Sequence, residues 1–304
     1  MRIAVMGAGS TGGYFGGMLA HSGNDVSLIA RGAHLESIKS NGLRVVRDDE
    51  EFTVQCQATD DPSDIGYVEL ALLCVKTYQN TAAIPLMQPV VGPDTTVLSL
   101  QNGVDSYLRA AEVLGESTVL PGAAFIEAGI LAPGTVRQTG SLVRIVFGET
   151  NGGETPRCLA IRDAFLGAGV PAEILPDIRA GQWGKFLFIA TMAGVTSMAR
   201  ATLAELMPQA HWRKVVLACL TEIDIVARAN GVNLPPDIVA DTVSYIEEHL
   251  VDLQASMHTD LMAGRPLELD ALNGAVVQAG KDAGVATPVN DVIYAMLKGH
   301  QEGR

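Results

Sequence analysis

The chain has 304 residues, of which 48% are hydrophobic and 18% are charged, and its formal net charge is −13. This length and composition exclude a disordered chain and leave room for two domains with real cores. The acidic balance excludes general nucleic-acid binding, which needs a basic face. No apolar run is long enough to span a bilayer, and the first apolar run is too short for a signal peptide. We therefore expect a cytoplasmic protein without membrane or nucleic-acid partners.

The cysteines agree with that location. Cys56, Cys74, Cys158 and Cys219 are widely spaced and form no C-x-x-C pair. Disulfides are rare in a reducing cytosol. We expect four buried free thiols.

The first stretch of the chain, MRIAVMGAGSTGGYFGG, carries the clearest motif. Residues 2–6 predict a short buried strand, and an apolar helical run follows the glycines. Gly7, Gly9 and Gly12 have the G-x-G-x-x-G spacing of the dinucleotide-binding turn between a strand and a helix. The alternative is a glycine-rich turn that binds nothing, but the order strand, glycines, helix, strand favours the cofactor. The candidate cofactor-binding residues here are Gly7, Ala8, Gly9, Ser10, Thr11 and Gly12.

The second strand, predicted over residues 25–30, bears on the choice of cofactor. An NAD enzyme usually has an acidic residue at its end, about 20 residues after the fingerprint, to bind the ribose 2′-OH. Here Arg31 stands at that end instead. A guanidinium there suits a 2′-phosphate, although an ordinary solvated arginine is the alternative. The sequence therefore favours NADP.

Further strand signals complete an α/β pattern. Residues 43–46 and 52–56 predict a strand pair inserted over the sheet. The apolar runs 68–75 and 95–100 predict buried parallel strands. Lys76 and Asn102 follow these two runs, at the sheet edge where ligands bind. Capping of a following helix is the alternative for both, but two polar side chains at this edge favour ligand contact.

The last part of this half predicts antiparallel strands. Residues 118–126, 134–139 and 143–148 are separated by short turns at 132–134 and 139–141. A helix over 156–166 and a strand over 172–175 follow, and Pro176 ends the pattern. We predict a Rossmann-type dinucleotide-binding domain over residues 1–176.

From residue 177 the pattern is helical. Apolar residues repeat at helical spacing over 212–227, and Asn230-Gly231 predicts a left-handed stop. Further helices are expected over about 236–262, about 269–283, and from Thr287-Pro288 to Lys298. The fold class is therefore an α/β Rossmann-type domain followed by an all-α domain over residues 177–304.

Two stretches of the helical half carry candidate chemistry. Lys185 is a cation in an otherwise apolar helix, where lysines are seldom buried without a partner. The alternative is a lysine whose amine reaches solvent past the core. Glu268, Asp270 and Asn273 open a later helix, and favourable interaction with its dipole is their alternative explanation.

These stretches and the motifs of the first half together resemble ketopantoate reductases (2-dehydropantoate 2-reductases). The resemblance covers essentially the whole chain, and the order and spacing of its blocks make it specific. The blocks are GAGSTGG from Gly7, Arg31, CVKTYQ around Lys76, QNG around Asn102, APGTVRQTG from Ala132, WGK ending at Lys185, SMHTDLMAGRPLELDALNG from Ser256, and ATPVN from Ala286.

The resemblance implies reduction of 2-oxopantoate to pantoate with NADPH, on the route to pantothenate and coenzyme A. It implies that Lys185 is the general acid and that Glu268 orients and polarises it. It also implies that Ser256 holds the substrate and that Asn102 lies near nicotinamide and substrate. Arg31 and Lys76 match cofactor contacts of the family. The chemistry is sound, because hydride addition to a ketone develops negative charge on oxygen, which needs a proton donor.

One departure from the family concerns the substrate pocket. The family often has asparagines four and eight residues after the catalytic lysine, where they bind the substrate hydroxyl. Here these positions are Ile189 and Ala193, on the helix face of Lys185. They leave the reaction type intact but favour a more apolar substrate, unless Thr196 or Asn273 holds the hydroxyl.

We expect the active site in the cleft between the two domains. The predicted function is reduction of ketopantoate, with a related reductase of a more apolar 2-oxo acid as the alternative. A non-catalytic dinucleotide-binding protein is a further alternative, but it would need neither Lys185 nor Glu268. No metal is expected, and the exposed helical faces could support a homodimer.

Overall fold

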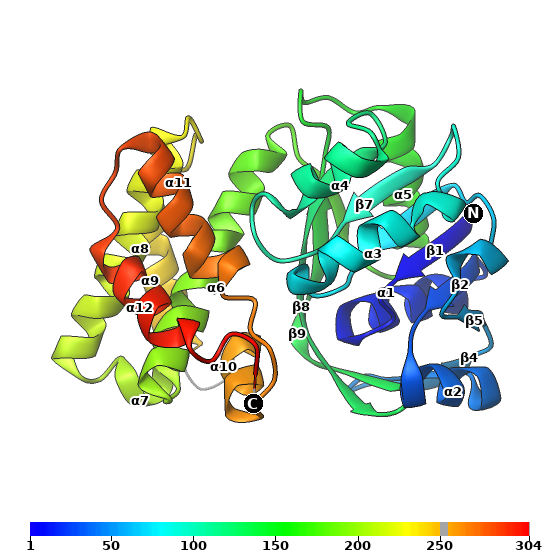
Figure 1. Cartoon of the computed structure of the whole chain (residues 1–304), viewed down its shortest axis with the longest axis horizontal. Coiled ribbons are helices and arrows are strands. Elements are labelled where there is room, and N and C mark those ends of the chain that lie inside the picture. The colour runs from blue at the N-terminus through cyan, green and yellow to red at the C-terminus, as the bar shows by residue number, and fades with distance from the viewer. Residues whose placement is uncertain (250–254, 304) are drawn as a thin grey trace. The chain divides into compact units, whose positions relative to one another are not determined.

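The computed structural model describes residues 1–249 and 255–303. The chain divides into two compact units (Figure 1). The N-terminal unit comprises Met1–Gln101 and Ser106–Ile178, and the C-terminal unit comprises Asn102–Asp105 and Arg179–Arg304. The short segment Asn102–Asp105 therefore packs with the helical part of the chain, although it follows a strand of the N-terminal sheet.

A ten-stranded mixed sheet forms the centre of the N-terminal unit as far as its residues are described. Its order is β4-β3-β9-β8-β7-β6-β1-β2-β5, and β10 pairs with β9. Adjacent strands are parallel along the series β5-β2-β1-β6-β7-β8 and in the pairs β3–β9 and β9–β10, whereas β8–β9 and β3–β4 are antiparallel. The bounds are β1 (Arg2–Met6), β2 (Asp25–Ile29), β3 (Leu43–Val46), β4 (Glu51–Val54), β5 (Gln57–Thr59), β6 (Leu70–Leu73), β7 (Thr96–Ser99), β8 (Val119–Ala132), β9 (Thr135–Phe147) and β10 (Ala172–Ile174).

Helices cover both faces of this sheet (Figure 1). Successive side chains of a strand point to opposite faces, so Ile3 and Val5 of β1 join one core cluster and Ala4 and Met6 join the other. Helices α1, α2 and α5 contribute to the first cluster, and α3 and α4 to the second. The bounds are α1 (Ser10–His21), α2 (Gly32–Asn41), α3 (Asn80–Leu86), α4 (Ser106–Leu114) and α5 (Pro156–Gly167), with short 3-10 turns at Pro62–Asp64, Thr77–Gln79 and Gln88–Val90.

Three expectations about this sheet were wrong. The turn predicted at residues 139–141 does not end a strand, because β9 runs on as one strand through Gly140. Instead the register shifts there, between the pairs Phe125–Arg144 and Glu127–Thr139, and Gly140 takes a φ of 73°. A bulge of this kind bends a strand without ending it. The pair β3–β4 is not an insertion over the sheet, because β3 pairs with β9 and extends it, and β5 was not predicted at all.

The described residues of the C-terminal unit form helices joined by loops and no strand, which confirms a Rossmann-type domain followed by a helical domain. Its core joins apolar side chains of α6, α8, α11 and α12, among them Phe186, Leu220, Val276 and Ile293. The bounds are α6 (Ile178–Ala199), α7 (Leu203–Leu206), α8 (Ala210–Ala229), α9 (Ile238–Glu248), α10 (Ser256–Met262), a π-helical turn (Asp270–Gly274), α11 (Ala275–Ala283) and α12 (Pro288–Lys298).

The single helix expected over residues 236–262 was wrong. Helix α9 ends at Glu248, with His249 as its cap, and α10 starts only after Ala255, whose backbone is extended. The predicted helix also covers residues 250–254, which lie outside the described part of the chain. The apolar pattern was correct for both pieces, but an apolar periodicity does not show a break between two helices that share one core.

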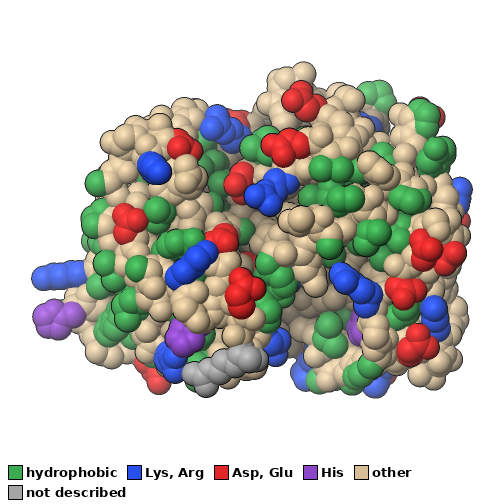
Figure 2. Space-filling view, in the orientation of Figure 1, with side chains coloured by type: hydrophobic (Ala, Val, Ile, Leu, Met, Phe, Trp, Pro, Cys, Tyr) green, Lys and Arg blue, Asp and Glu red, His purple; other side chains and the backbone are tan. Residues whose placement is uncertain are grey.

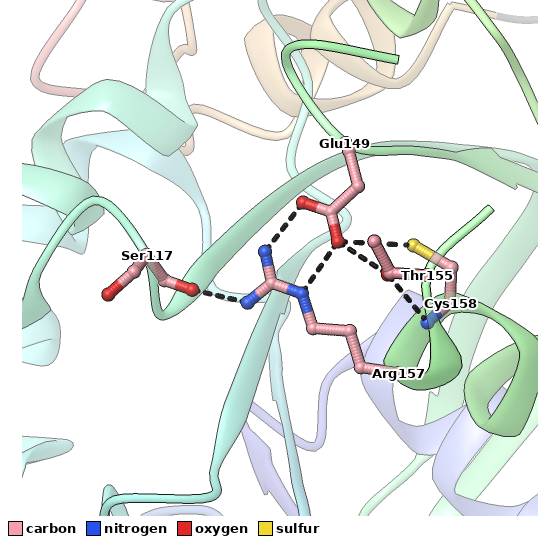
Figure 3. Close-up of polar contacts among 5 residues, drawn as sticks. All are labelled: Ser117, Glu149, Thr155, Arg157 and Cys158. Atoms are coloured by element: carbon pink, nitrogen blue, oxygen red, sulfur yellow. Dashed lines mark hydrogen bonds and ion pairs between the residues drawn. The ribbon is translucent and has the colours of Figure 1, made fainter. Parts of the chain in front are cut away.

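A partly buried ion pair connects the end of β9 with the start of α5 (Figure 3). Glu149 accepts hydrogen bonds from Arg157 Nε at 2.8 Å and Nη2 at 2.6 Å, and from Thr155 Oγ1 at 2.6 Å. The same guanidinium donates to the Ser117 carbonyl, and the Cys158 thiol lies 3.7 Å from Glu149 Oε1. Hydrogen bonding to Arg157 holds the pKa of Glu149 below its usual value, although burial opposes the shift. The cluster stabilises the fold.

All four cysteines are free, but only two are fully buried. Cys158 and Cys219 are buried, whereas Cys56 and Cys74 are half-buried, so the expectation of four buried thiols was partly wrong. Burial raises the pKa of Cys56 to about 11 and the pKa of Cys74 and Cys219 to about 12. These thiols therefore stay protonated near neutral pH and are poor nucleophiles.

The surface carries charges of both signs. On the face shown in Figure 2, Lys and Arg side chains are interspersed with Asp and Glu and with small apolar areas. Among the described helices, none combines the length and the apolar composition that crossing a membrane requires.

Candidate active site

The glycine turn between β1 and α1 has the geometry of a phosphate cradle. Gly7 has a φ of 95°, and a Cβ there would lie 2.6 Å from Val75 Cγ1. A Cβ at Gly12 would lie 2.2 Å from the carbonyl oxygen of Gly7. By contrast, a Cβ at Gly9 would meet nothing within 4 Å, so this side of the turn is open. A pyrophosphate can therefore approach the backbone at Gly9, whereas the other two glycines serve packing.

The start of α1 is prepared for an anion. Gly9 is its N-cap and supplies no side-chain hydrogen bond, and the first turn contains no acidic residue. The first N–H groups of a helix lack intrahelical partners and point with the positive end of its dipole towards any bound anion. Ser10, Thr11 and the neighbouring backbone thus fit the pyrophosphate of a dinucleotide.

His34, which no sequence pattern marks, supports this turn. Gly134, in the turn between β8 and β9, donates its backbone N–H to Nδ1 of His34 at 3.0 Å. Nδ1 must then be the acceptor, so Nε2 carries the proton and donates to the Ala8 carbonyl, 2.8 Å away. His34 lies in α2, far from the glycines in sequence, and no local pattern identifies such a contact.

Arg31 lies where the sequence placed it, directly after β2 and at the N-cap of α2. Its side chain is exposed, and the first turn of α2 contains no acidic residue. No acidic side chain there competes with a ribose phosphate for the guanidinium. Position and charge are therefore suited to a 2′-phosphate.

Polar side chains at the ends of β6 and β7 hold this edge of the sheet. Lys76 follows β6 and caps the 3-10 turn at Thr77–Gln79. Buried Gln101 follows β7, donates from Nε2 to the Val75 carbonyl at 2.7 Å, and exchanges hydrogen bonds with the Asn80 amide. Gln101 is a second residue that the sequence analysis missed. It fixes the backbone from which Asn102 continues.

Three predicted site residues meet within the C-terminal unit. Lys185 of α6 donates from Nζ to Oδ1 of Asn102 at 3.2 Å, and Nδ2 of Asn102 donates to Oε2 of Glu268 at 3.4 Å. One amide thus connects the ammonium and the carboxylate, with its acceptor towards the cation and its donor towards the anion. Segments far apart in the sequence form this group.

The electrostatics of the group favour proton transfer. Burial lowers the pKa of Lys185 to about 8, and the Glu268 carboxylate opposes this shift. Glu268 itself is only 4% exposed. A lysine with a pKa near 8 is still protonated at neutral pH and gives up its proton more readily than an ordinary lysine. This group can therefore donate a proton to a developing alkoxide.

The face of α6 next to Lys185 is apolar. Ile189 is half-buried and Ala193 is buried, one and two turns after Lys185. Thr196 continues the same face, but its hydroxyl donates to the Met192 carbonyl at 2.7 Å. The two positions that the sequence analysis singled out therefore offer no hydrogen bond from their side chains.

A hollow of about 460 Å³ opens at the far end of this face, and Ser256 is beside it. Ser256 is the first residue of α10, and its side chain is exposed. Its neighbours line the hollow rather than Ser256 itself. The lining residues are Thr196, Thr202, Ala255, His258, Thr259, Met262 and Ala263. In the described part of the chain, no cluster of His, Cys, Asp or Glu could hold a metal ion.

Comparisons with known proteins identify related sequences along the chain. The family described as ketopantoate reductase PanE/ApbA matches residues 3–152, and its C-terminal domain matches residues 177–301. A 2-dehydropantoate 2-reductase of Mesorhizobium japonicum is 29% identical over 98% of this chain and 97% of its own length.

Solved structures are similar over almost their whole length. A PanE/ApbA family ketopantoate reductase from Ralstonia eutropha is 32% identical, with a TM-score of 0.91 over 99% of this chain and 98% of that one. D-mandelate dehydrogenase, solved with NADH and anilino(oxo)acetate, is 27% identical, with a TM-score of 0.90 over 99% of this chain and 98% of that one. The similar structures thus include proteins named as a ketopantoate reductase and as a D-mandelate dehydrogenase.

Proposed function

This chain belongs to the ketopantoate reductase PanE/ApbA family, and on that premise we propose that it reduces 2-dehydropantoate (ketopantoate) to pantoate with NADPH, a step of pantothenate biosynthesis. It is an oxidoreductase that acts on CH–OH groups and uses a nicotinamide dinucleotide. The observation that carries the proposal is the contact of Lys185 and Glu268 with the two ends of the Asn102 amide. A protein that only binds a dinucleotide needs no such proton donor.

The N-terminal unit would hold the cofactor. Its pyrophosphate fits the open turn at Gly9 and the first N–H groups of α1, and Arg31 is suited to the 2′-phosphate of NADPH. Lys76, at the end of β6, is a further candidate contact. When bound, the nicotinamide supplies the hydride for the carbonyl carbon of the substrate.

The C-terminal unit would supply the proton. As the carbonyl oxygen of the 2-oxo acid gains negative charge, the Lys185 ammonium donates a proton to it and becomes a neutral amine, leaving a hydroxyl group. Asn102 holds Nζ through its Oδ1 and is in turn bonded to Glu268. Glu268 keeps Lys185 protonated before the reaction, because its charge raises the lysine pKa. Solvent returns the proton to Lys185 afterwards.

A second candidate function is reduction of a more apolar 2-oxo acid. The observation that favours it is the apolar face of α6 at Ile189 and Ala193, which offers no partner for a substrate hydroxyl. The similarity to D-mandelate dehydrogenase supports this candidate, because mandelate is a 2-hydroxy acid whose side chain is an apolar ring. Both candidate functions use the same proton donor, Lys185, and differ only in the substrate that the pocket binds.

The experiment that tests the proposal is a panel of 2-oxo acids assayed with NADPH and with NADH. The panel contains ketopantoate, its analogue without the hydroxyl, an aromatic 2-oxo acid and pyruvate. A higher kcat/KM with ketopantoate and its analogue than with the aromatic acid and pyruvate would support the proposed function, and the highest value with the aromatic acid would support the second candidate. NADPH binding without turnover of any member would reject both and indicate a non-catalytic dinucleotide-binding protein.

A further inference from the structure

Asn273 is buried between three elements of the C-terminal unit. It lies in the π-helical turn Asp270–Gly274, five residues after Glu268, and is 0% exposed. Its Nδ2 donates to the carbonyl of Ala190 in α6 at 3.2 Å and to Oδ1 of Asn290 in α12 at 3.0 Å. The side chain therefore ties the π-helical turn to the helix that carries Lys185.

The orientation of this amide is fixed from α8. The Glu222 carboxylate accepts hydrogen bonds from the backbone N–H of Val289 and Asn290 and, at 2.8 Å, from Asn290 Nδ2. A carboxylate only accepts, so Asn290 must direct its Nδ2 to Glu222 and its Oδ1 to Asn273. Asn273 must then present Nδ2 to this acceptor. The chain of contacts Glu222, Asn290, Asn273, Ala190 thus has one consistent arrangement.

Gly194 provides the space for this contact. A Cβ at Gly194 would lie 2.6 Å from both Nδ2 and Oδ1 of Asn273, closer than real Cβ atoms come. The close approach lets Nδ2 reach a carbonyl in the middle of α6, whose second lone pair remains open beside the helical bond. A larger residue at position 194 would push the amide and the π-helical turn away from α6.

Asn273 does not serve the substrate. At about 100° per residue, Ala190 and Gly194 lie about 140° and 180° around α6 from Lys185, whereas Ile189 lies only about 40° from it. The amide is wholly buried on that other face. The burial and the contacts of Asn273 argue against the expected alternative role as a partner of the substrate hydroxyl.

We infer that Asn273 is a positioning residue that holds Glu268 in register with Lys185 by fastening the π-helical turn to α6. Glu268 immediately precedes Leu269, whose carbonyl accepts from Gly274 N at 2.9 Å across the wide turn. Such wide turns interrupt the regular helix and are frequent at functional sites. The inference rests on the proposed function, because it assigns Asn273 a purpose in keeping the proton donor charged and aimed.

The consequence is measurable at Lys185. In the C-terminal unit, Glu268 is the charged group that raises the Lys185 pKa, and the neutral Asn102 lies between them. If Asn273→Ala lets Glu268 move away, the Lys185 pKa must fall below its value of about 8. The fold should survive this substitution. Asn290 Oδ1 still accepts a hydrogen bond from the Cys219 thiol, 3.6 Å away, and the Ala190 carbonyl still accepts its hydrogen bond within α6.

The experiment measures the Lys185 pKa by NMR on ¹³C-methylated lysines, together with the pH profile of kcat. In Asn273→Ala we expect the Lys185 pKa to fall by roughly half a unit or more and kcat at neutral pH to fall about tenfold. The KM for NADPH should not change, because the cofactor motif lies in the other unit. Gly194→Ala should produce the same changes and should add little in the Asn273→Ala background.

Gly280→Ala is the matched control. A Cβ at this glycine of α11 would lie 2.7 Å from Thr287 Cγ2, so it disturbs the same unit without touching Asn273. It should lower Tm and leave the Lys185 pKa and kcat unchanged. If Asn273→Ala folds and its Lys185 pKa is unchanged, the inference is overturned. If Asn273→Ala does not fold, the Lys185 pKa of Gly194→Ala alone tests the inference. If the wild type reduces no 2-oxo acid, the proposed function fails, but the lysine titration still decides the inference.

Discussion

The imidazole of His34 donates its Nε2–H to the Ala8 carbonyl at 2.8 Å, inside the glycine turn of the N-terminal unit. The other ring nitrogen accepts the N–H of Gly134, from the turn between β8 and β9. Ser37 of the same helix donates to the Pro133 carbonyl in that turn. Helix α2 therefore connects the phosphate cradle with the far end of the β8–β9 hairpin.

We predict that His34→Ala weakens NADPH binding about tenfold, which corresponds to about 1.4 kcal/mol. The change leaves the Ala8 carbonyl and the Gly134 N–H without their partner, so the turn loses a fixed geometry. His34→Gln keeps an amide donor for Ala8 and should lose less. Fluorescence titration with NADPH measures both. The control is His21→Ala, which removes a ring stacked on Phe52, and equal losses in the control and in His34→Ala would contradict the prediction.

Cofactor choice follows from Arg31. We predict that NADPH is preferred over NADH by at least tenfold in kcat/KM, or about 1.4 kcal/mol, because a guanidinium pairs with the 2′-phosphate. Arg31→Ala should raise the KM for NADPH and leave that for NADH nearly unchanged. Initial rates with both cofactors provide the measurement. Equal use of NADH and NADPH by the wild type would show that Arg31 does not select the cofactor.

The pH dependence of reduction follows from Lys185. The proposed proton transfer needs the ammonium form, whose fraction falls as the pH rises through the Lys185 pKa of about 8. We therefore expect kcat for reduction to be flat below this pH and to fall above it, and oxidation of the 2-hydroxy acid to rise over the same range. Glu268→Gln should move the alkaline limb to lower pH, because the carboxylate raises the lysine pKa.

Removal of the proton donor gives a second test. Lys185→Ala should lower kcat about a hundredfold or more, within the range of general acid catalysis, and leave NADPH binding nearly unchanged. Glu268→Ala should also lower kcat, and the double variant should be little worse than Lys185→Ala, because the two residues act as a unit. Steady-state kinetics of Lys185→Ala, Glu268→Ala and the double variant measure these losses in kcat. Strictly additive losses would mean that Glu268 acts independently of Lys185.

The pair Glu149–Arg157 predicts a pH-dependent stability. Glu149 has a lowered pKa in the folded state, so its contribution is present above the unfolded pKa and is lost as the pH falls through the folded value. Arg157→Gln should cost about 1.5–3 kcal/mol near neutral pH, and the difference from the wild type should shrink in acid. Urea unfolding near neutral pH and in acid measures this difference in the free energy of unfolding. Arg213→Gln, which breaks an exposed pair with Glu247, should cost less than about 1 kcal/mol.

The elements of the fold that have a local signature were predictable. The strand, glycines and helix at the start of the chain could be predicted from their spacing, because Gly7 and Gly12 meet steric demands of the turn and Gly9 leaves it open to a phosphate. The continuation of β9 through Gly140 was not predictable, because a glycine with positive φ is equally typical of a turn and of a bulge. The short strand β5 has only three residues, too few for a periodic pattern.

The candidate site was predictable only in part for the same reason. Lys185 and Glu268 are conspicuous as charges in apolar surroundings, and their chemistry could be inferred from the resemblance. The roles of His34, Gln101 and Asn273 depend on contacts with carbonyl groups far away in sequence. Every residue has a backbone carbonyl. A side chain that donates a hydrogen bond to a carbonyl therefore cannot be matched with a particular partner residue from the sequence.

The substrate pocket can be tested with one pair of substrates. Ketopantoate carries a hydroxyl beyond its quaternary carbon, and 3,3-dimethyl-2-oxobutanoate lacks it. The side chains of Ile189 and Ala193 cannot pair with that hydroxyl, and a polar group buried without a partner costs about 1–3 kcal/mol. Ile189 also adds apolar surface that favours a methyl group in its place. We therefore predict that the ratio of kcat/KM for ketopantoate to that for the analogue is near one or below.

Installing the missing amides should reverse this ratio. Ile189→Asn with Ala193→Asn places two donors one and two turns after Lys185, and each net hydrogen bond gained is worth about 0.5–1.5 kcal/mol. The ratio should therefore shift towards ketopantoate by about tenfold. Ile189→Val is the control, because it changes the volume and adds no polar group. A hundredfold preference of the wild type for ketopantoate, roughly 2.7 kcal/mol, would mean that another polar group holds the hydroxyl. Thr196 is the next residue to test in that case, because it continues the same face of α6 and lines the adjacent hollow.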